Sequence, residues 1–110
     1  MKNHEREAQI WSVLVLAART QQILSYGMLE KIVGIPKHGL GPVLAPIQAY
    51  CKNNKLPPLT SIVVNEKTGL PSEGFTEAID IFGAQARVFV FDWLSRKVPT
   101  PQELADSTTD

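Results

Sequence analysis

Cysteine, histidine and long apolar runs are scarce in this chain, and each scarcity excludes a kind of site. The single Cys51 cannot form an internal disulfide or a multi-cysteine zinc site, and the two distant histidines suggest no metal, so we expect no cofactor. The longest apolar run, residues 13–18, is far shorter than the roughly 18 residues that a membrane span needs. The charged first residues lack the apolar segment of a signal peptide. We therefore expect a cytoplasmic protein with no membrane partner.

An excess of charge is also missing. The 11 basic and 11 acidic residues cancel, which argues against a strongly basic nucleic-acid binder. The charges are nevertheless uneven along the chain, because residues 19–55 contain five basic residues and one acid, whereas residues 56–81 contain one basic residue and four acids. The basic third is either a surface for a polyanion or a chance cluster on a solvated face.

A regular apolar period is present in the first half. Spacings of three and four predict a helix over residues 4–21. Ser25 is a suitable cap for a second helix over residues 26–33, and Gly34 is a natural left-handed stop. Pro36 then fixes a turn.

Prolines limit the third helix. It should begin near residues 39–42, because a proline is tolerated in a first turn. Pro46 is predicted to split the region into a short helix that ends near Ala45 and a second helix over residues 46–54.

The spacing of the apolar residues changes in the second half of the chain. The β-branched run at residues 59–64 predicts a strand, followed by a turn over residues 65–69 and a short return strand or wing over residues 70–75. Residues 82–95 predict a well-buried helix, and a strand over residues 87–93 is the alternative.

The end of the chain carries a capping-box signature, Thr100 to Glu103, which can start a short helical turn. The fold class expected is α+β, mostly helical and winged-helix-like, with a helix-turn-helix, a short β-hairpin and a buried C-terminal helix. Residues 1–98 are expected to form this single domain, and residues 99–110 are expected to form a polar tail.

The turn region resembles one family. DNA alkylguanine alkyltransferases and alkyltransferase-like proteins carry a Tyr-Gly-x-Leu-x-x-x-x-Gly-x-Pro segment at the helix-turn-helix, and the matching residues here are Tyr26, Gly27, Leu29, Gly34 and Pro36. A glycine-bearing stretch, a proline-led strand with a Val-Val pair and a Gly-Phe loop follow in similar order at residues 39–45, 57–64 and 73–75. The resemblance covers residues 8–95 and implies a DNA-binding winged-helix domain.

Two departures from the family bear on chemistry. The family's Pro-Cys-His-Arg segment would fall on residues 59–62, which contain no thiol, histidine or arginine, so alkyl transfer is not expected. The recognition helix of the family bears an arginine that fills the gap left by a flipped base, but Leu40 stands there in this chain, with His38 close by.

The resemblance implies a role in DNA binding for four residues. Tyr26 would lie near a backbone phosphate. Gly27 would stand at the start of its helix, and Gly39 and Gly41 would let the protein backbone approach DNA. The alternative is that these glycines only allow two core helices to turn a corner.

Phosphate contacts would come from Lys31, Lys37, Lys52 and Lys55, provided that all four share one face with the turn at residues 34–41. Each such contact adds about 0.9 to the salt slope of binding. His38 is a candidate contact to a base or a phosphate.

A second polar group follows the predicted strand and turn, at Thr60, Ser61, Asn65, Lys67 and Glu73. It could form a small pocket where the family holds a base, although a serine without a His-Asp constellation is a poor nucleophile. The function favoured is therefore a non-catalytic DNA-binding protein, with a modified or flipped base as a candidate ligand. The alternatives are a protein interaction module of the same fold with no nucleic-acid role and a small enzyme that uses this pocket.

Overall fold

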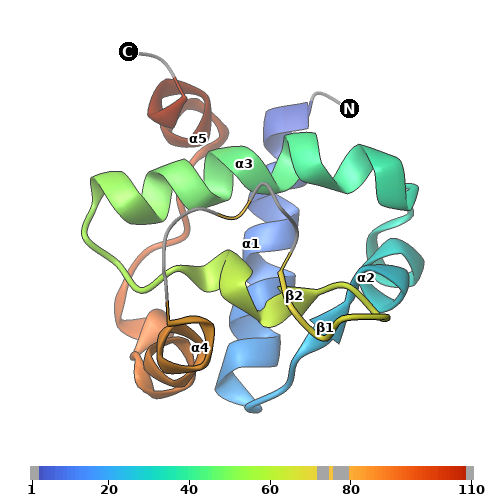
Figure 1. The fold of residues 1–110 in the computed structure, drawn as a ribbon. Helices are drawn as coiled ribbons and strands as arrows, with labels where there is room; N and C mark the ends of the chain where they lie inside the picture. The colour runs from blue at the N-terminus through green and yellow to red at the C-terminus, as the bar shows by residue number, and fades with distance from the viewer. Residues whose placement is uncertain (1–2, 72–74, 76–79, 109–110) are drawn as a thin grey trace.

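The computed structural model describes residues 3–71, 75 and 80–108, and this part of the chain is mostly helical (Figure 1). Its α-helices are α1 (Asn3–Arg19), α2 (Tyr26–Val33), α3 (Lys37–Asn53), α4 (Ile81–Val90) and α5 (Pro101–Ser107). Two 3-10 helices, η1 (Leu59–Ile62) and η2 (Trp93–Ser95), and two short strands, β1 (Leu24–Ser25) and β2 (Val63–Val64), complete the described elements. The broad α+β, mostly helical class predicted from the sequence is confirmed.

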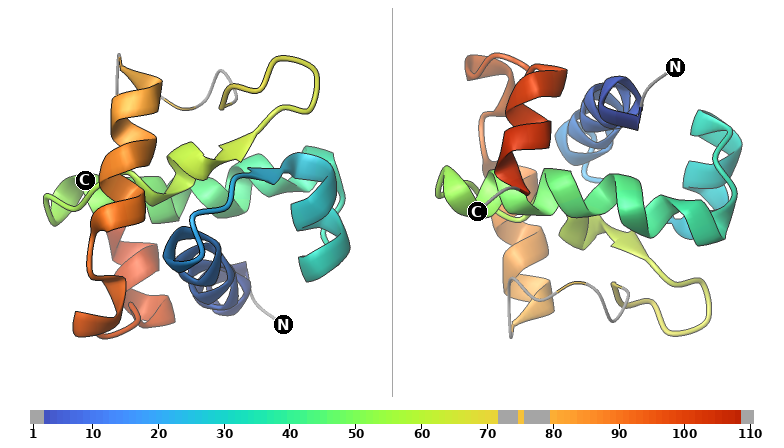
Figure 2. Two further views of the ribbon diagram at one scale, coloured as in Figure 1. Left: turned by 90° about the horizontal axis from the view of Figure 1, so that it is seen from below. Right: turned by 90° about the horizontal axis from the view of Figure 1, so that it is seen from above.

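Helix α1 is central, since it passes behind α3 in Figure 1 and lies beside α3, seen nearly end-on, in both views of Figure 2. The apolar positions that predicted this helix are buried, with Leu14 and Ala18 fully inaccessible. The helix ends two residues before the predicted limit, because Gln21 adopts a positive φ of 55°. Helix α2 lies at one end of α3, and α4 and α5 lie toward its other end (Figure 2).

Helix α2 has the predicted bounds for the predicted reasons. The Ser25 hydroxyl accepts a hydrogen bond from the Met28 N–H at 3.1 Å, which satisfies one of the free donors at the helix start. Gly34 ends the helix with a φ of 75°, in the left-handed region that favours glycine. The Arg6 guanidinium of α1 donates a hydrogen bond to the Val33 carbonyl at the same end.

The predicted break at Pro46 is wrong, because α3 runs without interruption through Pro42 and Pro46. A proline inside a helix costs about 3 kcal/mol through the lost N–H and the clash with the preceding turn. The buried face of α3 offsets this cost, because full burial of one large aliphatic side chain contributes about 1.5–3 kcal/mol. That face includes Leu40, Leu44 and Ile47.

The strand predicted over residues 59–64 is mostly wrong. Residues 59–62 form η1, and only Val63 and Val64 are extended. These two residues pair in parallel with β1, Leu24 opposite Val63, instead of turning into a hairpin. An apolar run that is buried on all sides has no alternation to reveal its conformation, which explains the error. The described residues contain no β-hairpin, so the winged-helix detail is not confirmed.

The predicted helix over residues 82–95 is shorter and less buried than expected. It ends at Val90, and the alternative strand over residues 87–93 is also wrong. One face packs inward through Ala84 and Val88, whereas Phe82 is 72% exposed. The burial predicted for this helix is therefore wrong for the side that carries Phe82, Ala86 and Val90.

The capping box at residues 100–103 is confirmed in both of its hydrogen bonds. It starts α5, which packs on α1 and α3 and buries Leu104 completely. The segment that the sequence assigns to a polar tail therefore contains a helix that contributes Leu104 to the core.

Candidate nucleic-acid interface

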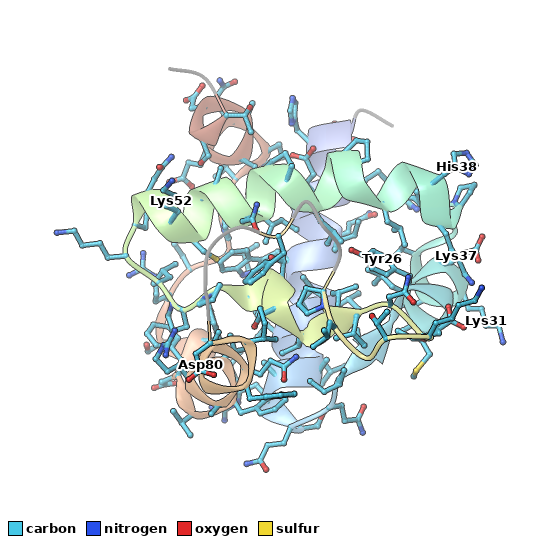
Figure 3. All side chains as sticks on the ribbon, in the orientation of Figure 1. Tyr26, Lys31, Lys37, His38, Lys52 and Asp80 are labelled. Atoms are coloured by element: carbon cyan, nitrogen blue, oxygen red, sulfur yellow. The ribbon has the colours of Figure 1, made fainter. Side chains whose placement is uncertain are left out.

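Tyr26 occupies the centre of the candidate site, and local structure fixes its place. It is the first residue of α2, directly after the β1 residue that pairs with Val64. The short parallel sheet therefore brings the start of α2 beside the segment that follows β2. In Figure 3 Tyr26 lies between α3 and this segment.

Two adjoining cavities meet at Tyr26 and Gly41. The outer cavity, of about 650 Å³, is lined by mostly polar and charged residues: Tyr26, Lys37, His38, Gly41, Asn65, Glu66 and Lys67. The inner cavity, of about 200 Å³, is lined by mostly apolar residues: Tyr26, Gly41, Leu44, Ala45, Gln48, Thr60, Pro71 and Phe75. A larger, charged recess thus adjoins a smaller apolar one at these two residues.

Glu66 contacts residues from two helices at the outer cavity. Its carboxylate accepts a hydrogen bond from the Gly27 N–H at 3.0 Å and pairs with the Lys37 ammonium at 2.9 Å. The hydrogen bond and charge of Lys37 lower the pKa of Glu66, with smaller contributions from the Gly27 N–H and the charge of Lys31. Glu66 raises the pKa of Lys37 in turn. One carboxylate therefore connects the starts of α2 and α3.

Gly27 leaves room for this contact. A Cβ atom at position 27 would lie 2.8 Å from the Glu66 carboxylate, so the end of the flexible Glu66 side chain would have to shift. The other two glycines differ from each other. A Cβ atom at Gly39 would meet the Ile35 side chain at 3.1 Å, whereas Gly41 has open space around it. Of these three glycines, Gly41 alone is exposed with open space around it, so that a large ligand could approach its backbone.

The four lysines do not share one surface. Lys31 and Lys37 lie near one end of α3, together with His38, and Lys52 lies at the other end (Figure 3). Helix geometry places Lys37 and Lys52 about 22 Å apart along the axis. Lys55 follows Lys52 just beyond the end of the helix. The expected convergence of four ammonium groups therefore fails for Lys52 and Lys55.

The polar pocket predicted after residue 59 is divided between the two cavities. Thr60 lines the inner cavity, and Asn65 and Lys67 line the outer one. Ser61 is fully buried and lines neither cavity, which places its hydroxyl out of reach of a substrate in either. Glu73 lies outside the described residues. The hydroxyl oxygens of Thr60 and Ser61 are buried and have no hydrogen-bond partner among the described residues.

The apolar lining of the inner cavity was missed by sequence reasoning. Leu44, Ala45 and Gln48 follow Gly41 by three, four and seven residues, so one face of a continuous helix presents all of them. The assumption of a break at Pro46 concealed this signal. Pro71 and Phe75 carried no such pattern.

The chain matches no protein-family model, no curated protein and no solved structure. Among the described residues, no group of three or more histidine, cysteine, aspartate or glutamate side chains could hold a metal ion. The helices described are too short or too polar to cross a membrane.

Proposed function

We propose that this chain is a non-catalytic DNA-binding protein, similar to alkyltransferase-like proteins, that holds a modified or flipped base. The outer cavity would receive the DNA backbone, and the inner cavity would receive the base. The observation that carries the proposal is the junction of these two cavities at Tyr26 and Gly41. Ligand sites are concave, mostly apolar and supplied with a few polar groups, as the inner cavity is.

Thr60 supports the assignment of the inner cavity to a base. Its side chain is 94% buried (6% exposed), and its hydroxyl has no partner among the described residues. A buried polar group without a partner is uncommon and calls for an explanation. The edge of a base offers both donors and acceptors, and either could satisfy a hydroxyl.

Charge supports the assignment of the outer cavity only in part. Lys37, His38 and Lys67 line it, and Lys31 lies close enough to act on Glu66. Glu66 opposes them. We therefore expect few phosphate contacts and a small salt slope, of about 2–3, because each contact contributes about 0.9.

Two finer parts of the proposal rest on separate observations. The winged-helix relationship rests on the order of α2, turn and α3, and on the closed loop in which the Asn65 N–H donates to the Leu70 carbonyl at 2.8 Å. A cytoplasmic location rests on the sequence's single cysteine, because one thiol cannot form the internal disulfides that are typical of oxidising compartments.

The first experiment measures the anisotropy of a labelled 16-base-pair duplex over a range of salt concentrations. Lys37→Ala should weaken binding and reduce the salt slope by about 0.9. Lys52→Ala is the matched control, because it removes an exposed lysine from the other end of the same helix. No binding at low salt would refute the proposal, and equal losses in the two variants would refute this site.

The second experiment tests the inner cavity with a duplex that carries one 2-aminopurine, a base whose fluorescence rises when it leaves the stack. Wild-type protein should raise the fluorescence. Ala45→Leu should abolish the rise, because Ala45 is an exposed residue whose enlargement fills the cavity without entering the core. Thr60→Val should reduce the rise without loss of stability, since it removes the unpartnered hydroxyl at nearly constant shape. A rise that survives in both variants would place the base elsewhere.

An interaction module without a nucleic-acid role is the second candidate function. The exposed apolar side chains at Leu16, Leu94 and Val98 favour it. Absence of DNA binding together with a specific protein complex would decide in its favour.

A further inference from the structure

A third hollow lies between α1 and the segment that follows α4, and it shares no residue with the two cavities at Tyr26. We call it the groove. Its volume is about 250 Å³, and its deepest residues are Trp11 and Trp93, whose rings meet edge to face at 5.7 Å. The indole N–H of Trp93 donates to the Val88 carbonyl at 2.8 Å, which fixes the ring. The floor of the groove is therefore rigid and aromatic.

The sides of the groove are apolar and face solvent. Leu16, Leu94 and Val98 line it and are 66%, 69% and 50% exposed. Single apolar residues on a protein surface are ordinary and need no explanation. Three of them around one aromatic floor form a patch of the kind that marks an interaction surface.

A second apolar surface lies on α4. Phe82, Ala86 and Val90 are exposed and follow one another at intervals of four residues, so they share one side of the helix. Phe82 is 72% exposed and Val90 is 81% exposed. We call these three residues the α4 stripe. It is convex, as the outer surface of a helix must be, whereas the groove is concave.

We propose that a second copy of this chain places its α4 stripe in the groove, and that the first copy does the same in return. The two surfaces are neighbours, since Val90 precedes Leu94 by four residues. A two-fold interface uses the same patch on both subunits, so a patch that contains both a ridge and a hollow can be complementary to itself. One contact of this kind covers both exposed apolar surfaces at once.

Charge complementarity supports the same partner. Asp80 is exposed at the start of α4, where it also caps the helix by accepting from the Gly83 N–H at 3.0 Å. Arg96 is exposed on the rim of the groove and has no ion pair among the described residues. The other rim arginine, Arg19, lies 3.6 Å from Asp92 of its own chain. A stripe with an acidic end thus fits a groove with an unpaired guanidinium.

Sedimentation equilibrium of the purified full chain over a concentration series tests the proposal without DNA and so independently of the proposed function. Wild-type protein should contain a two-chain species that grows with concentration. Leu94→Glu in the groove and Val90→Glu in the stripe should each raise the dissociation constant at least about tenfold, because a charge would be buried in an apolar contact. Ile32→Glu on α2, 54% exposed and outside both surfaces, is the control and should have no effect.

A mixture of the two variants identifies which surfaces meet. Leu94→Glu keeps an intact stripe and Val90→Glu keeps an intact groove, so the mixed pair retains one complete contact. It should associate more tightly than either variant does alone. A monomeric wild type, an equal loss in Ile32→Glu, or no recovery in the mixture would each overturn the proposal.

Discussion

The Glu66 carboxylate lies 2.9 Å from the Lys37 ammonium, and this pair stands at the mouth of the outer cavity. The contact places a negative charge where the proposed function needs a phosphate. Both side chains are about half exposed, so the pair contributes little to stability. Its effect on a bound polyanion should be larger than its effect on the fold.

Glu66→Gln should therefore raise the affinity for duplex DNA several-fold, because it removes a repulsive charge and releases Lys37. Fluorescence anisotropy at low salt measures the change. Asp92→Asn is the matched control, since Asp92 is an exposed carboxylate with an arginine partner on α1. An unchanged affinity in Glu66→Gln, or an equal gain in Asp92→Asn, would contradict a role for this carboxylate at the interface.

The same pair makes a prediction about pH. The pKa of Glu66 is lowered by Lys37, so its contribution to folding is present above the ordinary value of 4.5 and is lost as pH falls through the folded value. The pKa of Lys37 is raised, so its contribution is present below 10.5 and is lost as pH rises through the folded value. Lys37→Gln should move the pKa of Glu66 upward, toward 4.5, as followed by the NMR shift of its carboxyl carbon. A titration that does not move in this variant would show that the pair is absent in solution.

A substitution at Gly41 should change the stability of the fold and the affinity for DNA in opposite directions. The residue lies inside α3 with open space around it, so Gly41→Ala should stabilise the fold by about 0.5–1 kcal/mol in urea denaturation. The same variant should weaken DNA binding if the backbone approaches the duplex there. Gly39→Ala is the comparison, because its Cβ would press on Ile35 and cancel much of the gain. A stabilised Gly41→Ala with unchanged affinity would leave the glycine with no role beyond the helix.

Leu104 tests how far α5 belongs to the core. The side chain is fully buried on α1 and α3, so Leu104→Ala should destabilise the protein by about 2–5 kcal/mol in the same denaturation experiment. Gln102→Ala on the exposed side of α5 should change stability by no more than about 0.5 kcal/mol. A change below 1 kcal/mol in Leu104→Ala would mean that α5 is detached in solution.

Elements with local signals could be predicted from the sequence. The hydroxyls of Ser25 and Thr100 accept from N–H groups three residues ahead, and Gly34 needs no partner to adopt a positive φ. These helix ends depend on a few adjacent residues, which a sequence displays directly. Their confirmation follows from that locality.

Elements governed by packing could not be predicted. Pro46 stays inside α3 because the helix is held by buried side chains that contact α1 and α5. Residues 59–62 are buried against α1, α3 and α4, and these partners lie far away in the sequence. The proline and the β-branched residues are visible in the sequence. The side chains that pack against them come from distant segments, and their effect on the conformation is larger.

The candidate site also contains some residues that the sequence predicts and others that depend on packing. Tyr26, Lys37, His38 and Gly41 were predicted together and lie together around the outer cavity. Lys52 was grouped with them by charge, but a continuous α3 carries it to the opposite end. The apolar walls of the inner cavity look like core residues in a sequence, and only their arrangement distinguishes them.

The parallel pairing of Leu24 with Val63 has a consequence for folding. It joins segments that are distant in the chain, so the entropic cost of loop closure must be met before the pair is formed. Helices α2 and α3 lie between the two strands in the sequence and can form earlier from local contacts. The recess proposed for a base is bounded by both the early and the late segments. It should therefore be complete only after β1 and β2 have paired, so a partly folded chain should lack this recess altogether.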